Sequence, residues 1–157
     1  MDSEVKIMLD RADNEILAAK ALKRLSEEEK YQQELNIPDK TTFYSSVISH
    51  SYYSIFYAAR AYLIFKKVKL SSEQGIHQQV YFKFRKIIVE EPAGKEILEL
   101  YEGVRTKAEV LLGIFNDEKR KRKAFTYETI SQANKSPAEE SITNASTFFL
   151  HIQSFIK

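Results

Sequence analysis

The chain has 157 residues, of which 43% are hydrophobic and 29% are charged, and its formal net charge is +2. This length predicts one domain over residues 1–157, with enough apolar residues for a core. The absence of cysteine excludes disulfides, thiolate nucleophiles and cysteine-ligated zinc, and four glycines with three prolines are too few for a β-rich chain full of tight turns.

The N-terminal residues and the apolar runs indicate where in the cell the protein is expected. The first residues, MDSEVKIMLDRAD, are acidic and have no apolar centre, so we expect no signal peptide. The longest apolar run is interrupted by Arg60 and is too short to span a bilayer. Together with the lack of cysteine, this favours a cytoplasmic protein without membrane contact.

Apolar residues recur at helical spacing along most of the chain and predict an all-α fold. The expected architecture is an up-and-down bundle of four or five helices. The helices are expected at about 3–35, 42–67, 74–90, 92–115 and from the capping box Ser136–Glu139 onward.

The second of these helices has three distinct stripes when projected at 100° per residue. The first is apolar and comprises Ile48, Tyr52, Ile55, Phe56, Ala59 and Leu63. The second carries only small residues: Ser51, Ser54, Ala58 and Ala61. The third is aromatic and polar: His50, Tyr53, Tyr57 and Arg60. A helix with so little solvated surface is central or lies at a subunit interface.

Arg60 is the single charged residue in the most apolar part of that helix. A guanidinium in such a place is either stacked on an aromatic ring and paired with a carboxylate, or it faces a cleft as an anion site. Both interpretations stay open on the residues alone.

A run of five basic residues is the clearest signal for a polyanionic partner. It comprises Lys119, Arg120, Lys121, Arg122 and Lys123. Adjacent cations repel each other, and phosphates relieve this repulsion with release of counterions. Phe125 and Tyr127 follow and can stack on unpaired bases. The alternative is a solvated basic helix end, partly offset by Asp117 and Glu118.

The histidines and glycines predict neither a metal site nor a cofactor. His50, His77 and His151 have no metal-ligand spacing on one helix face. The four glycines are isolated, so no glycine-rich phosphate loop is present.

Four segments together resemble the HEPN family (higher eukaryotes and prokaryotes nucleotide-binding domain), and in particular its small stand-alone prokaryotic members. They are SYYSIFYAARAYL (51–63), SSEQGIHQQVYFKF (71–84), EILAAKALKR (15–24) and SPAEESITNASTFFLHI (136–152). The resemblance implies a helical bundle that commonly forms homodimers, with polar residues such as Arg60 facing a cleft between protomers.

The best-known activity of the family is metal-independent RNA cleavage by an Arg followed four to six residues later by His. Here Arg120 is followed by Phe125 and Arg122 by Tyr127, and no His lies between His77 and His151. Many small members instead have Arg, Ala, an acidic residue and Tyr. Two registers fit this form in part.

One register runs from Arg122 to Tyr127 and the other from Arg105 through Ala108 and Glu109 to Val110. The distance to the last helix favours the first of them.

The resemblance implies a nucleotide- or RNA-binding protein in a toxin–antitoxin-type pair with a nucleotidyltransferase, with Tyr127 as the residue that this partner modifies. Arg122 and Tyr127 are the candidate catalytic residues. The residues expected to bind nucleotide or RNA are Arg60, His50, Tyr53, Tyr57, His77, Lys119, Arg120, Lys121 and Lys123.

Two alternatives are carried beside this interpretation. In the first, the protein is a ribonuclease with a rearranged site, in which His50 or His77 reaches Arg122 through space. In the second, it is a non-catalytic dimeric interaction module whose aromatic helix forms only an interface. Because the usual Arg–His motif is incomplete, the sequence leaves open whether the protein is an enzyme.

Overall fold

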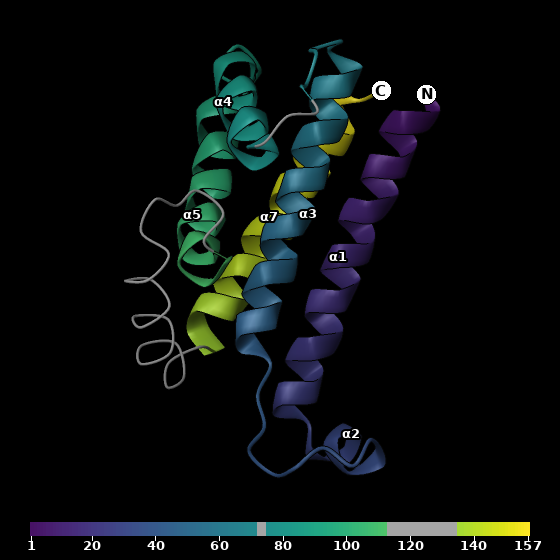
Figure 1. The fold of residues 1–157 in the computed structure, drawn as a ribbon, viewed down its shortest axis with the longest axis vertical. Coiled ribbons are helices and arrows are strands. Elements are labelled where there is room, and N and C mark those ends of the chain that lie inside the picture. Colours follow the sequence, from purple (N-terminus) through teal and green to yellow (C-terminus); the bar gives the residue numbers. More distant parts are fainter. Residues whose placement is uncertain (72–74, 113–134) are drawn as a thin grey trace.

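The computed structural model describes residues 1–71, 75–112 and 135–157, and within these ranges the regular structure is helical, without strands (Figure 1). The helices are α1 (Ser3–Glu27), α2 (Glu29–Glu34), α3 (Tyr44–Phe65), α4 (Ile76–Ile88), α5 (Gly94–Leu112) and α7 (Lys135–Phe155). The predicted all-α bundle is therefore confirmed. None of the described helices is both long and apolar enough to cross a membrane.

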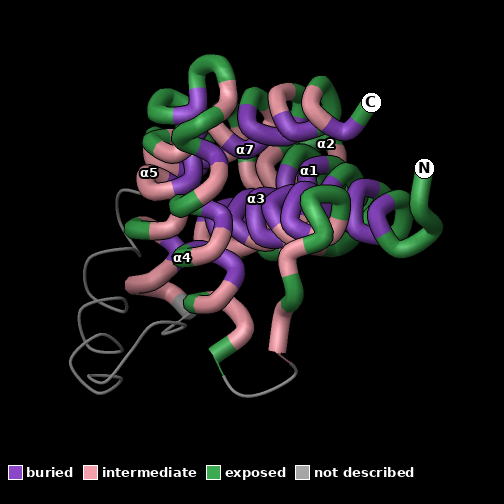
Figure 2. Tube along the Cα trace, turned by 90° about the horizontal axis from the view of Figure 1, so that it is seen from above, coloured by how far each residue is buried: buried purple, intermediate pink, exposed green. Residues whose placement is uncertain are grey.

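Helix α3 occupies the centre of the bundle. It contacts α1, α4, α5 and α7, and 13 of its 22 residues are buried. Figure 1 shows α1 along one side of α3 and the pair α4 and α5 on the other, while Figure 2 shows the buried residues concentrated along α3. Of the two positions that the sequence left open, the centre of the bundle is the one that α3 occupies within the chain.

The stripes of α3 explain its position. The apolar and the small-residue stripes are buried, and all four small residues are completely shielded from solvent. Side chains of this size allow neighbouring helices to approach closely. The third stripe remains partly exposed, so the polar face that the sequence predicts lies at the edge of the core.

The first predicted helix is divided in two by Glu28, whose backbone is extended (φ −106°, ψ 105°). After this break, the buried amide of Gln32 donates a hydrogen bond to the carbonyl of Leu25 at 2.7 Å. The N–H of Phe43 donates to Ser26 Oγ at 2.7 Å, which ties the returning chain to the end of α1. The helix predicted over 3–35, with fraying expected in its last residues SEEEKYQQELN, is thus a helix that ends at Glu27 and a separate short helix, α2.

Two helix starts also differ from the prediction. The fourth helix begins at Gly94 rather than at Pro92, because Ala93 has a left-handed backbone (φ 57°) that is not helical. Position 94 requires glycine, since a Cβ there would lie 1.9 Å from the carbonyl oxygen of Ile88. The described part of α7 already includes Lys135, so Ser136 lies inside the helix and is not its N-cap.

Candidate functional site

The polar face of α3, defined by His50, Tyr53, Tyr57 and Arg60, runs along the helix between α1 and α4. All four residues are partly exposed. Their spacing of three to four residues places them on one side of the helix. Helix α1 contacts one flank of this face, helix α4 contacts the other, and a hollow opens at Arg60.

Helix α1 holds the part of the face that includes His50 and Tyr57. The Nδ1 atom of His50 lies 2.5 Å from a carboxylate oxygen of Glu15. The guanidinium of Arg11 lies 5.5 Å from the centroid of the Tyr57 ring. These contacts give His50 and Tyr57 a structural role in joining α1 to α3.

Helix α4 places His77 against the other flank of the polar face. Gly75, with φ +85°, sets the turn that leads into α4, and His77 follows in the first turn of the helix. The imidazole stacks on Phe56 with ring centroids 4.2 Å apart, and the centroid of Tyr53 lies 5.9 Å away. Three aromatic contacts therefore fix the position of the ring, since Tyr52 also stacks on it.

The surroundings of His77 determine its charge. Burial, followed by the positive charge of Arg60, lowers the pKa of His77 below 6.5. At neutral pH the imidazole is therefore neutral. Its Nδ1 atom lies 2.9 Å from the hydroxyl of Tyr52. Burial raises the pKa of Tyr52 well above 10, so the phenol stays protonated.

Arg60 lies at the end of the polar face, where a hollow of about 330 Å³ opens. Its Nε atom is buried and has no hydrogen-bond partner among the described residues. The ring that its guanidinium approaches is Phe56, at 6.0 Å. The hollow is lined by Glu4, Arg60, Ile64, Lys67, Val68 and Leu70. A buried N–H group without a partner costs free energy, which an anionic ligand can offset.

Arg105, the second register for the family motif, is packed within the bundle. Its guanidinium lies 3.9 Å from the centroid of the Tyr81 ring. The Tyr81 hydroxyl donates to Glu102 at 2.6 Å. The charge of Arg105 opposes the increase in the pKa of Tyr52 that burial causes.

The site thus unites residues that the sequence predicted separately and adds two that it did not. His77 and Arg60 both lie beside the Phe56 ring, whereas His50 lies apart on the α1 side. Tyr52 and Phe56, assigned to the apolar stripe, hold the His77 ring. The presence of a tyrosine in the apolar stripe could have identified Tyr52, because a buried tyrosine hydroxyl normally requires a hydrogen-bond partner.

Several predicted residues lie outside the described part of the chain. They are Tyr127 and the five residues of the basic run, Lys119, Arg120, Lys121, Arg122 and Lys123. That these residues lie close to Arg60 and to a histidine therefore stays a prediction. Within 1–71, 75–112 and 135–157 no cluster of three His, Asp or Glu residues could hold a metal ion.

The comparison with known proteins agrees with this architecture. The model of the HEPN domain matches residues 19–152, which is most of the chain. No curated protein and no solved structure matches the sequence significantly. HEPN domains are helical, generally related to nucleotides or RNA, and commonly dimerise. The chain, with its helical bundle and the match over residues 19–152, belongs to the HEPN domain family.

Proposed function

We propose that this protein is a cytoplasmic, homodimeric component of a toxin–antitoxin-type pair, and that it binds RNA or nucleotide phosphate at the polar face of α3. The observation that carries the proposal is the half-buried Arg60, whose Nε lacks a hydrogen-bond partner among the described residues. A guanidinium offers a planar fork of donors that matches a phosphate group.

The residues around Arg60 support an anionic ligand. Lys67 lines the same hollow and adds a second positive charge, while Glu4 is the one carboxylate in the lining. Tyr53 and Tyr57 present partly exposed rings along the same face, and such rings stack on unpaired bases. Phosphate at Arg60 and bases on the tyrosines together describe a single-stranded ligand.

Arg60→Gln is expected to weaken binding of single-stranded RNA about tenfold, because one charge-assisted phosphate contact is lost. The slope of log affinity against log salt should fall by about 0.7, the contribution of one phosphate contact on a single strand. Fluorescence anisotropy over a salt series measures both quantities. Arg85→Gln is the matched control, since Arg85 is exposed on α4. Equal affinities of the two variants would contradict the proposed site.

The partner in the proposed pair is a nucleotidyltransferase that modifies Tyr127. In this reaction the phenolic oxygen of Tyr127 attacks the α-phosphorus of a nucleoside triphosphate, and pyrophosphate leaves. Tyr127 follows directly after the basic run, whose charges attract a triphosphate. The proposal rests on the family resemblance around Arg122 and Tyr127.

Tyr127→Phe is expected to abolish the mass increase of the protein when it is incubated with the nucleotidyltransferase, a nucleoside triphosphate and Mg²⁺. Intact-protein mass spectrometry measures this increase. Tyr53→Phe, which changes a partly exposed tyrosine of α3, is the control and should be modified like the wild type. A modified Tyr127→Phe protein would exclude Tyr127 as the acceptor.

A second candidate function is metal-independent RNA cleavage, favoured by a neutral His77 that stacks on Phe56, the ring that the Arg60 guanidinium approaches. Arginine can stabilise the charge of the phosphorane, and a neutral imidazole can accept the proton of the 2′-hydroxyl. If Nδ1 of His77 donates its hydrogen to Tyr52, Nε2 is the nitrogen that acts as the base.

His77→Gln is expected to lower metal-free RNA cleavage by at least about 100-fold, the usual contribution of a general base. Since the base must be neutral and its pKa is lowered, the wild-type rate should be flat near pH 7 and fall only below pH 6.5. Cleavage of an RNA pool in EDTA tests this, with His151→Gln as control. Absence of cleavage by the folded wild type would leave binding as the function.

A further inference from the structure

Helix α1 places two charged residues beside the polar face of α3, and we call them the α1 edge. They are Arg11 and Glu15, which are four residues apart and therefore lie on one side of α1. The guanidinium of Arg11 lies 5.5 Å from the centroid of the Tyr57 ring. The Oε2 atom of Glu15 lies 2.5 Å from Nδ1 of His50. The α1 edge therefore borders the part of the polar face that carries the tyrosines.

The carboxylate of Glu15 is unexpected beside a surface that binds phosphate, because its negative charge repels a polyanion. Proteins that read nucleic-acid bases use a carboxylate differently, as an acceptor for the N–H groups of a base edge. The Glu15 side chain is 25% exposed, and its second oxygen, Oε1, accepts no hydrogen bond from a described residue. Since each carboxylate oxygen can accept two hydrogen bonds, Glu15 has acceptor sites left for a ligand.

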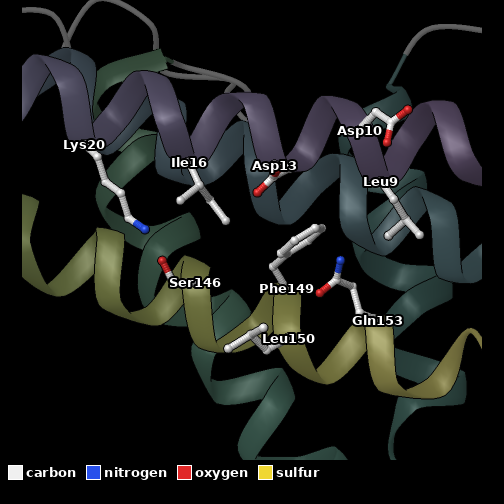
Figure 3. Close-up of a pocket in the computed structure, with 9 residues that line it drawn as sticks. All are labelled: Leu9, Asp10, Asp13, Ile16, Lys20, Ser146, Phe149, Leu150 and Gln153. Carbon is white, nitrogen blue, oxygen red and sulfur yellow. The ribbon is translucent and has the colours of Figure 1, made fainter.

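The two carboxylates that precede Glu15 in α1 belong to a different surface. Asp10 and Asp13 line a groove of about 360 Å³ between α1 and α7 (Figure 3). Positions 13 and 15 lie about 200° apart around a helix, so the groove and the α1 edge are on different sides of α1. Of these three carboxylates, Glu15 is the one that contacts the polar face among the described residues.

Tyr53 is the ring of the polar face on which a base can stack at this edge. Its side chain is partly exposed, and its ring centroid lies 6.4 Å from that of Tyr57. Burial raises the pKa of Tyr53 above 10, and the neighbouring Tyr57 and Glu15 add to this effect, so the phenol is neutral at physiological pH. Tyr53 follows His50 by three residues, and Cβ atoms at this spacing are about 5–6 Å apart.

We propose that Glu15 selects guanine in an RNA strand that lies on the polar face, an inference that rests on the proposed function. The guanine stacks on Tyr53 and turns its Watson–Crick edge to Glu15, which is held beside Tyr53 through His50. This edge presents two adjacent donors, N1–H and N2–H, and they match the two oxygens of the carboxylate. Oε1 accepts one of these hydrogen bonds, and Oε2 accepts the other with its second lone pair.

The other bases lack this pair of donors. Adenine and cytosine each present one amino group beside a ring nitrogen, whose lone pair faces the carboxylate and repels it. Uracil presents one N–H group between two carbonyl oxygens. A bidentate contact between a side chain and a base typically discriminates against the wrong base by about tenfold. The α1 edge therefore supplies base selection, whereas Arg60 supplies affinity for phosphate.

RNA heptamers test this selection, each with uridine at every position except a central guanosine, adenosine or inosine. Fluorescence anisotropy of the labelled strands measures their Kd for the full chain. The wild type should bind the guanosine strand about tenfold more tightly than the adenosine strand. Inosine keeps N1–H but lacks the 2-amino group, so its strand should bind with an intermediate affinity.

Glu15→Gln should reverse the preference, because an amide presents one acceptor and one donor. This pattern suits adenine, which also presents a donor and an acceptor side by side. Asp13→Asn is the matched control, since it removes the same charge from the same helix but lines the groove toward α7, and it should keep the wild-type ratio. Each comparison is a ratio of two affinities within one variant, so a smaller folded fraction does not change it.

Two results would overturn the inference alone: equal binding of the guanosine and adenosine strands by the wild type, or a Glu15→Gln variant with the wild-type ratio. If none of the heptamers binds, the proposed function fails and base selection fails with it. Free GMP at the concentration of the strand should not displace it, because a strand also offers neighbouring phosphates. Displacement would overturn the RNA strand as the source of the guanine.

Discussion

Replacement of all five basic residues from Lys119 to Lys123 by glutamine is expected to remove most of the salt dependence of RNA binding. Each phosphate neutralised on a single strand contributes about 0.7 to the slope of log affinity against log salt, so five contacts contribute about 3.5. Extrapolated from 1 M salt, this slope corresponds to an affinity loss of up to about 3,000-fold at 0.1 M salt. A salt series with labelled single-stranded RNA measures the effect.

The control for this experiment removes cations from a different part of the chain. Lys83, Arg85 and Lys86 lie in α4, and changing all three to glutamine should alter the slope much less. If both multiple variants lose affinity equally, binding depends on the overall charge rather than on the basic run. If neither changes the slope, the non-catalytic interaction module becomes the better interpretation of the protein.

Phe84→Ala is expected to destabilise the fold by about 3–5 kcal/mol, the range for truncation of a buried phenylalanine. Phe84 of α4 is completely buried at the meeting point of four helices. Its ring centroid lies 5.7 Å from that of Tyr62 in α3, 5.6 Å from Tyr101 in α5 and 5.4 Å from Phe148 in α7. Truncation would therefore leave a cavity that no single helix can close.

Urea unfolding followed by circular dichroism measures this loss, and Phe82→Ala is the matched control. Phe82 lies in the same helix but is 50% exposed, so its truncation should cost about 0.5 kcal/mol or less. Similar losses in the two variants would show that α4 is not anchored through Phe84. Since α4 also carries His77, the Phe84 variant should lose any function that depends on the position of that imidazole.

The helices could be predicted from the sequence because their signals are local. The three stripes of α3 follow from residue spacing alone, and they indicated a helix that is either central or at a subunit interface, with one polar face. The sequence predicted that the first helix frays in residues 26–36, but not that it breaks sharply at Glu28 and is followed by a second short helix. The turn is instead stabilised by Gln32 and Ser26, through hydrogen bonds to Leu25 and Phe43.

The candidate site could be predicted only in part. Arg60, His50, Tyr53 and Tyr57 share a face of one helix, so periodicity is sufficient to group them. Which of them is engaged elsewhere depends on the neighbouring helices. The carboxylate of Glu15 in α1 forms a hydrogen bond with His50, whereas the Nε atom of Arg60 has no hydrogen-bond partner among the described residues.

By itself, the sequence determined the fold class, the polar face of α3 and the resemblance to the HEPN family, which the family comparison confirms. The tertiary structure decided that His77 lies beside the same Phe56 ring as Arg60 and is held by Tyr52 and Phe56. The physical reason is the range of the two signals. Periodicity describes one helix, whereas the charge of an imidazole depends on burial and on groups from several helices.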